Sequence, residues 1–440
     1  MLFSSLEFLC FFFPVFFLVY FLVSRLCKKA VWPRNAVLLV FSLVFYAWGE
    51  LSYFWLLMLS IGINYVFALL IGRCKPGPNT KGSRAGAKAL LAGDVAVNLA
   101  LLGVFKYAGL AVTTLNTICG TAFTVPEIAL PIGISFFTFQ QIWYLREVYA
   151  GTFSQVPTPA EYLTYSFFFP TVSSGPILKP ENFFPQLREA SPLPQDTAAG
   201  LYAIGLGLAK KVLLADNLGV LVNNGWGSLS ELTALTAWCV ILGYTLQLYF
   251  DFSGYCDLIA GCARLLGLRL PINFDSPYRS LSVTEFWKRW HMTLTAFLRE
   301  NVYFPLGGSR KGAARTYLNI LVVFLISGFW HGAGWTFLIW GALHGLAQVA
   351  ERAWGPSRDR LPRAVRWGLT FLFVNVAWVF FRATSLADAL AIVKAMLTMN
   401  FGSLRDSITS AFALPGGFHP DGNAVYMMIW YAASLFACLG

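Results

Sequence analysis

The residue with the clearest chemical potential is His331, which lies in the apolar, glycine-rich run Ser327-Gly-Phe-Trp-His-Gly-Ala-Gly-Trp335. The whole chain has only four histidines. An ionisable side chain is costly to bury in a segment hydrophobic enough to enter a membrane, which favours a functional role. The alternative is a neutral core histidine that hydrogen-bonds a neighbouring helix. Imidazole exchanges protons near neutral pH, so we predict that His331 moves a proton and that Trp330 lines the same site.

A second histidine, His291, lies within the charged and aromatic segment 285–300. If this segment is one helix, Glu285 can pair with Arg289, and His291 shares a face with Trp287 and Lys288. A cationic face with aromatic rings could hold a phosphate-bearing donor close to a proton-transfer site. The candidate donor-binding residues are therefore Lys288, Arg289 and Trp290. The alternative is an amphipathic helix at the membrane interface whose long basic side chains reach toward water.

Two carboxylates, Asp251 and Asp257, lie six residues apart in a mainly apolar segment. Carboxylates within a membrane can carry protons, so Asp251 is a further candidate for the site. A structural role, in which the carboxylates pair with Arg264, Lys210 or a helix end, is the favoured alternative.

The remaining histidines and the cysteines give no sign of a further site. His344, thirteen residues after His331, is predicted to be structural, and His419 lies in a Gly/Pro-rich stretch predicted to be solvated. The eight cysteines include no Cys-x-x-Cys pair and mostly lie in apolar segments. We therefore expect packing cysteines, no disulfide and no metal site.

The composition places the chain in a membrane. Its 440 residues are 57% hydrophobic and 12% charged, about half the charged share of an ordinary soluble domain. Forty phenylalanines and fifteen tryptophans suit lipid-facing surface and interfacial aromatic belts. The net charge of +11 is distributed between apolar segments, which favours basic cytosolic loops over nucleic-acid binding.

The basic loops predict an orientation. The first basic residue, Arg25, follows the apolar run 8–23, so we expect an uncleaved first helix with its N-terminus outside. The stretch 73–88 contains five basic residues and no acidic one, which predicts a cytosolic loop on the same side as Arg25.

The apolar segments predict one helical membrane domain, residues 1–440, without internal repeats. Segments 130–148 and 162–178 contain prolines and charges, as expected of broken or re-entrant segments. The stretch 188–196 resembles a linker but is too short to separate domains. The sequence stops within the apolar run 424–439, which leaves the helix count at that end open. Further helices are expected at 36–49 and 51–72 (a short hairpin), 89–114, 201–222 and 235–255.

The segment around His331 is flanked by basic residues on both sides. Arg315 precedes the apolar run 317–345 and Arg352 follows it, so a single crossing would leave one basic flank on the wrong side. We favour a hairpin of two short helices that breaks at the glycines around His331. One long tilted helix is the alternative. The 16 residues from Arg315 to His331 correspond to ~24 Å of helix, within a hydrocarbon core of ~30 Å.

Several motifs resemble those of the membrane-bound O-acyltransferase (MBOAT) family, from the N-terminus to about Arg382. The best match is its bacterial branch of alginate and peptidoglycan O-acetyltransferases and D-alanyl-transfer membrane proteins. The resemblance implies an all-α, polytopic membrane fold of about 10–12 transmembrane or re-entrant helices around a central tunnel. It also implies acyl transfer to a hydroxyl, with the family's invariant histidine at His331 and its partner position at His291. The motifs are Phe105-Lys-Tyr107, Leu130-Pro-Ile-Gly-Ile-Ser-Phe-Phe-Thr-Phe-Gln140, Gly175-Pro-Ile177, Asp251-Phe-Ser-Gly-Tyr-Cys-Asp257, Phe286-Trp-Lys-Arg-Trp-His291, Tyr303-Phe-Pro-Leu-Gly-Gly308 and Trp330-His-Gly332.

This resemblance predicts an O-acetyltransferase of the bacterial cytoplasmic (inner) membrane that modifies an exported or cell-envelope polysaccharide of the alginate kind. The expected donor is acetyl-CoA from the cytosol, used as a substrate without any bound cofactor. The expected partners are membrane lipids, an extracytoplasmic acetyltransferase and the polysaccharide-export machinery, with no nucleic acid. His331 would be the general base, while His291 would orient it, bind the donor or polarise the acyl carbonyl. No serine nucleophile stands out near either histidine, which favours direct transfer.

Two alternatives remain at this point. One is transfer of D-alanine or another acyl group from a carrier-protein thioester to teichoic acid or peptidoglycan. The other is a transporter or flippase of a lipid-linked donor, because broken helices and intramembrane charges also suit transport.

Overall fold

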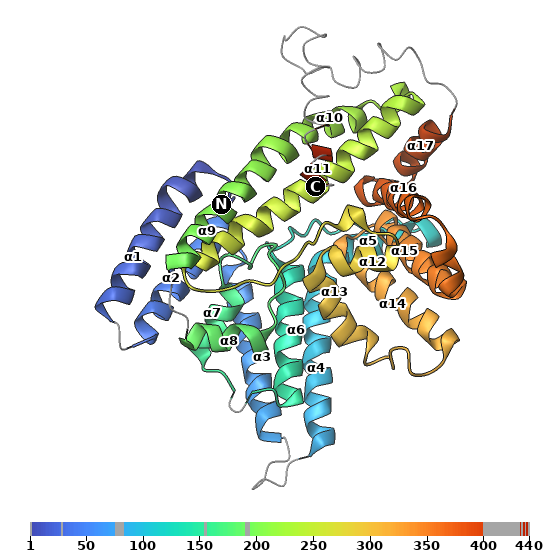
Figure 1. Ribbon diagram of the computed structural model, residues 1–440. Coiled ribbons are helices and arrows are strands. Elements are labelled where there is room, and N and C mark those ends of the chain that lie inside the picture. The colour runs from blue at the N-terminus through green and yellow to red at the C-terminus, as the bar shows by residue number, and fades with distance from the viewer. Residues whose placement is uncertain are drawn as a thin grey trace. The chain divides into compact units, whose positions relative to one another are not determined.

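The computed structural model describes residues 2–27, 30–74, 83–153, 156–189 and 194–398, together with 432, 434, 435, 437 and 438. Within these ranges every regular element is a helix, numbered α1 to α17 (Figure 1). This confirms the predicted all-α class. The chain divides into two compact units, the first of Met1–Gly205 with Asp257–Pro271 and the second of Leu206–Cys256 with Ile272–Gly440.

The first unit is built around phenylalanine. A π-helix, Glu7–Phe12, leads into α1, and Phe8, Phe12 and Phe16 lie on one side of this continuous helix. Their rings pack against Phe45 and Phe169 at centroid distances of 5.1 to 6.3 Å. The helices of this unit are α1 (Phe13–Leu26), α2 (Trp32–Gly49), α3 (Phe54–Cys74), α4 (Arg84–Leu102), α5 (Ala108–Cys119), α6 (Ile134–Ala150), α7 (Pro159–Phe167), α8 (Pro180–Glu189) and most of α9 (Pro194–Leu208).

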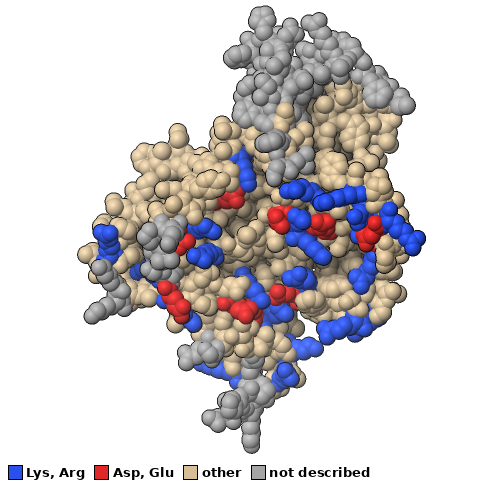
Figure 2. All heavy atoms as spheres, viewed as in Figure 1, with Lys and Arg blue, Asp and Glu red and all other residues tan. Residues whose placement is uncertain are grey.

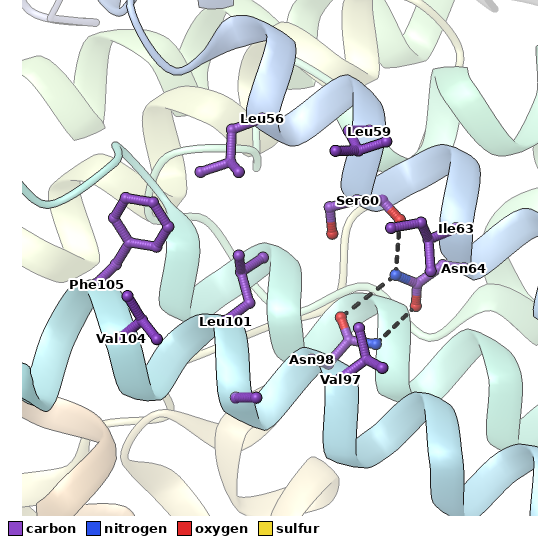
Figure 3. A pocket seen from close by; sticks show the side chains of 11 residues that line it. Leu56, Leu59, Ser60, Ile63, Asn64, Val97, Asn98, Leu101, Val104 and Phe105 are labelled. Atoms are coloured by element: carbon purple, nitrogen blue, oxygen red, sulfur yellow. Dashed lines mark hydrogen bonds between the residues drawn. The ribbon is translucent and has the colours of Figure 1, made fainter.

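Polar side chains of α3 and α4 are buried in this unit. Asp94 and Asn98 of α4 are fully enclosed, and the amides of Asn64 and Asn98 donate to each other's oxygens at 3.3 and 2.9 Å. This amide pair and Ser60 line one side of a largely apolar pocket of about 300 Å³ between α3 and α4 (Figure 3). The crossing predicted at 89–114 is longer than expected, because α4 continues through a π-helix into α5.

The predicted breaks at proline are half right. Pro131 precedes α6 instead of interrupting it, so the segment predicted as broken at 130–148 is one helix from Ile134 onward. The segment 162–178 is broken as predicted, since α7 ends at Phe167 and the next helix begins at Pro180. The difference follows from position, because Pro131 lies before the start of α6, where a proline is tolerated, while Pro170 and Pro176 lie between α7 and α8, where they disfavour a continuous helix.

The second unit contains both candidate histidines. Its aromatic core includes the rings of Phe286, Trp290, Trp340 and Trp378. The helices are α10 (Asp216–Gly227), most of α11 (Ala234–Leu265), α12 (Val283–Arg289), α13 (Met292–Leu298), α14 (Ala313–His331), α15 (Trp335–Trp354), α16 (Arg363–Arg382) and α17 (Leu386–Leu397).

Helices α14 and α15 form the predicted hairpin and lie side by side (Figure 1). The break is at Gly332-Ala333-Gly334, directly after His331. The prediction of short arms is wrong, because α14 has 19 residues and α15 has 20. Both helices extend into the basic flanks, which the hydrophobic run 317–345 does not include.

Two glycines allow the arms of this hairpin to approach closely. A Cβ on Gly328 would overlap the carbonyl oxygen of Phe337, and a Cβ on Gly341 would overlap that of Phe324. Small residues at a helix interface are a recurring means of close packing within membranes. The close approach at these glycines therefore determines the position of His331, which follows Gly328 by three residues.

We expect Gly328→Ala to separate the arms of the hairpin. Over-packing of this kind typically costs ~1–3 kcal/mol, so the melting temperature of the purified protein should fall and activity with it. Gly368→Ala is the matched control, since a Cβ at Gly368 of α16 meets nothing within 4 Å. Equal melting temperatures for the two variants would contradict the proposed contact.

The chain is a multi-pass membrane protein. Six of its described helical segments are long and apolar enough to cross a membrane, by length and composition. The number of 10–12 helices and the central tunnel stay predictions. Of the apolar run 424–439 the structure describes only residues 432, 434, 435, 437 and 438, and the expected solvated position of His419 lies outside the described residues. The six segments are Glu7–Leu26, Phe54–Cys74, Arg84–Cys119, Asp196–Gly227, Ala313–His331 and Arg363–Arg382.

Candidate active site

His331 is the last residue of α14 and lies at the tip of the hairpin. The chain leaves the helix there because Gly332 adopts an extended backbone conformation. Three aromatic rings surround the imidazole edge-on, with centroid distances of 4.8 Å to Trp330, 5.1 Å to Trp340 and 5.1 Å to Phe381. These rings come from α14, α15 and α16, so three helices position a half-buried imidazole.

His291 lies between two short helices and not inside one. Its backbone is left-handed (φ 44°), and it separates α12 from α13. The single helix predicted through 285–300 is therefore wrong, and His291 does not continue the face of Trp287 and Lys288. A positive φ is strained for a residue other than glycine, and such strain is concentrated at functional sites. The side chain is almost completely buried.

Residues 273–275, which precede α12, are hydrogen-bonded to the turn at His291. The carbonyl oxygen of Asn273 accepts from the N–H of Met292 at 3.0 Å, and the carbonyl oxygen of Arg289 accepts from the N–H of Asp275 at 2.9 Å. These two bonds clamp residues 273–275 against the turn at His291. The Asn273 side-chain oxygen lies 3.3 Å from Nδ1 of His291, and the ring of Phe252 on α11 packs edge-on at 4.9 Å.

The structure brings the two predicted histidines together. The centroids of the His291 and His331 rings are 6.5 Å apart, with an angle of 62° between the ring planes. This separation is too large for a direct nitrogen-to-nitrogen hydrogen bond of about 3 Å, but it suits one bridging hydroxyl or water. Burial lowers the pKa of His291 to about 3, so this imidazole is neutral at physiological pH. The pair can thus hold a hydroxyl and remove its proton.

The predicted donor-binding residues divide between surface and core. Lys288 is exposed, while Arg289 pairs with Glu285 at 3.0 Å, as predicted, and with Asp275 at 3.5 Å. Trp290 is buried among aromatic rings, with Phe274 at 5.0 Å and Trp378 at 5.1 Å. Figure 2 shows basic side chains exposed on the part of the surface formed by α12–α15.

Asp251 forms an ion pair, with one carboxylate oxygen 2.7 Å from Nζ of Lys211. Lys211 also pairs with Asp216 at 2.7 Å. The structural role predicted for Asp251 was a pair with Arg264 or Lys210. The structure instead pairs it with Lys211, the residue next to Lys210. Both lysines lie in the π-helix Ala209–Ala215, which changes the register of the side chains from that of a regular α-helix.

His344 is fully buried and accepts a hydrogen bond at Nδ1 from the indole N–H of Trp287 at 3.1 Å. The rings of Trp340 and Phe373 pack against it at 5.1 and 5.2 Å. This environment agrees with the structural role predicted for His344. All eight cysteines are free thiols.

Sequence reasoning did not find four residues that contact the two imidazoles, namely Asn273, Phe252, Trp340 and Phe381. Phe252 and Trp340 lie in apolar segments, where one aromatic residue resembles the next. Asn273 lies in a stretch without helical or strand periodicity, so no pattern relates it to His291. The one feature of the sequence that could have indicated Asn273 is that it is a polar residue in a connection between apolar segments.

The described part of the chain is helical and carries six candidate membrane spans, and its two neighbouring imidazoles are groups suited to proton transfer in a membrane-embedded enzyme. Residues 105–387 match the model of MBOAT, the membrane-bound O-acyltransferase family. The chain belongs to this family, and it is a membrane O-acyltransferase.

Curated relatives agree with this assignment. The chain is 38% identical over 435 residues to the peptidoglycan O-acetyltransferase of Helicobacter pylori, covering 92% of this chain and 81% of the relative. It is also 38% identical over 414 residues to the probable alginate O-acetylase of Pseudomonas aeruginosa, covering 92% and 76%. The similarity to the teichoic acid D-alanyltransferase of Streptococcus thermophilus is lower, 29% over 240 residues, covering 51% and 57%.

Proposed function

We propose that this enzyme transfers acetyl groups from a cytosolic thioester donor, acetyl-CoA, toward hydroxyls of an exported or cell-envelope polysaccharide. The observation that carries the proposal is the pair of imidazoles, whose ring centroids are 6.5 Å apart, with His331 at the tip of a helical hairpin and His291 at the turn between α12 and α13. The names of the two relatives at 38% identity support acetyl as the acyl group and a polysaccharide or peptidoglycan as the acceptor. The enzyme would be located in the bacterial cytoplasmic membrane with its N-terminus outside.

In the proposed reaction, His331 acts as the general base. Its unprotonated ring nitrogen takes the proton of the acceptor hydroxyl while the hydroxyl oxygen attacks the thioester carbonyl carbon. The new C–O bond forms, the C–S bond breaks, and the imidazolium returns its proton to the departing thiolate. The edge-on rings of Trp330, Trp340 and Phe381 hold the imidazole in place and limit its contact with water.

Partners follow from the position of the reaction. An enzyme that takes its donor from the cytosol and serves a polymer outside needs a route to that polymer. We propose an extracytoplasmic acetyltransferase and the polysaccharide-export machinery as its partners.

The experiment that tests this function uses purified protein in liposomes with isotopically labelled acetyl-CoA and a soluble polysaccharide acceptor. Ester-linked label on the acceptor is the expected result. A parallel reaction uses a carrier protein loaded with labelled D-alanine. If only this donor gives a labelled acceptor, the acyl group is D-alanine and not acetyl. A labelled lipid-linked donor that crosses the bilayer without forming an ester would indicate a transporter.

Donor binding gives a separate prediction for Lys288. Because its ammonium is exposed beside the His291 segment, Lys288→Gln should raise the apparent KM for acetyl-CoA about 3- to 5-fold, with kcat nearly unchanged. The effect should shrink at high salt, because exposed charges are screened over ~8–10 Å. Arg289→Gln should also raise KM, but it breaks the pairs with Glu285 and Asp275 and therefore also affects stability.

The matched control for Lys288→Gln is Arg363→Gln, an equal change of charge at an exposed position of α16. A lower kcat at unchanged KM for Lys288→Gln, or the same KM increase in the control, would argue against a phosphate contact at Lys288.

A further inference from the structure

Asn273 presents a buried amide oxygen to the imidazole of His291. This oxygen accepts from the backbone N–H of Thr293 at 3.1 Å and from the Thr293 hydroxyl at 3.0 Å. It also lies 3.3 Å from Nδ1 of His291. A backbone N–H can only donate, so the amide atom that faces Thr293 is the oxygen and not the nitrogen.

An acceptor at this place determines which ring nitrogen of His291 carries the proton. The amide oxygen has no proton to give, so Nδ1 must be the N–H donor in this contact. A neutral imidazole has one N–H only, which leaves Nε2 with a lone pair. The neutral state of His291 follows from its burial, as described above.

The amide is itself held on several sides. Its nitrogen donates to Sγ of Cys256 at 3.5 Å, and its backbone oxygen accepts from Met292 at 3.0 Å. With Thr293 bound to its side-chain oxygen, the amide cannot turn over without losing bonds to both neighbours. The acceptor is therefore a fixed part of the turn at His291.

We propose that Asn273 is a positioning residue that keeps His291 in the Nδ1–H form, so that Nε2 accepts a hydrogen bond during acyl transfer. This inference rests on the proposed function and makes it more specific. In this form His291 cannot donate to the acyl carbonyl, so it does not polarise that group. It instead supplies an electron pair, which suits a hydrogen bond from a water that bridges the two imidazoles, since their ring centroids are 6.5 Å apart.

The direct test is the tautomer itself. Protein labelled with ¹³C and ¹⁵N at histidine has four labelled residues, and comparison with His291→Asn assigns the signals of His291. We expect the wild-type ring to show the ¹³C and ¹⁵N shifts of the Nδ1–H form. Asn273→Leu should populate the Nε2–H form, and Asn273→Asp, which keeps an acceptor oxygen, should not. An Nε2–H ring in the wild type overturns the inference.

Kinetics supply the second test. Asn273→Leu should lower kcat about 10- to 100-fold with little change in the donor KM, by analogy with residues that orient metal-ligating histidines. Asn273→Asp should recover most of this loss. In a His291→Ala background Asn273→Leu should have no further effect on kcat, because the two residues act as one unit.

Thr293→Val serves as the structural control, since it removes the hydroxyl bond to Asn273 but keeps the backbone N–H. A loss from Asn273→Leu that is equally large in the His291→Ala background, or that Thr293→Val reproduces, overturns the positioning role. If Asn273→Leu does not fold, the tautomer of His291 in the wild type and in Asn273→Asp still tests the positioning role of Asn273. Failure of the proposed function would instead appear as full activity of a His331→Gln variant, which leaves the tautomer of His291 unaffected.

Discussion

His331→Gln should abolish detectable acylation of the acceptor polymer while the protein inserts and accumulates normally. Glutamine can form a hydrogen bond at this position but cannot take a proton at neutral pH. The loss of a positioned general base typically lowers the rate ~10²–10⁴-fold, so His331→Gln and His331→Ala should be about equally inactive. The measurement is the acetyl ester content of the polymer, with the yield of purified protein as the control for folding.

The surroundings of His331 make this comparison informative. The ring is held by aromatic neighbours at about 5 Å on three helices, so an alanine would leave a gap between them while a glutamine fills much of it. If cells with the His331→Gln variant keep a near-normal ester content at equal protein level, His331 is not the general base. That result would favour the transporter interpretation.

His291→Ala should also lower kcat strongly, by about 10²-fold, at the lower end of the range for a group that takes part in proton transfer. The matched variant is His291→Asn. Asparagine tolerates the left-handed backbone better than most residues and keeps a side-chain oxygen as acceptor. We therefore expect His291→Asn to retain more activity and a higher melting temperature than His291→Ala.

Melting temperatures and kcat values of the two variants can be measured on the same preparations. Equal losses of kcat for His291→Asn and His291→Ala at equal stability would mean that an acceptor at this position contributes nothing. Full activity of both variants would place His291 outside the reaction altogether.

The apolar periodicity was sufficient to predict most helices, because a membrane span needs a long run with few charges. The hairpin at His331 was predicted from the basic flanks together with the glycines, and the structure confirms it. The lengths of its arms were not predictable from hydropathy, because a helix continues past the apolar run wherever its backbone hydrogen bonds can be completed.

The candidate site was predictable in its two histidines but not in the residues around them. The resemblance to acyltransferases and the chemistry of imidazole both indicated His291 and His331. The break of the helix at His291 was missed, because no proline or glycine stands there to signal it and the left-handed turn is stabilised by bonds to residues 273 and 275. Contacts between segments distant in sequence leave no trace in local composition.

The close packing of α14 and α15 has a consequence for how the protein is made. Residues of a helical hairpin are near one another in sequence, and contacts of this kind form quickly. The glycine contact involves residues up to Gly341, whereas Phe381 of α16 is synthesised 40 residues later. During biosynthesis both arms of the hairpin therefore leave the ribosome before Phe381 does, and the pocket of His331 is open on one side until α16 packs.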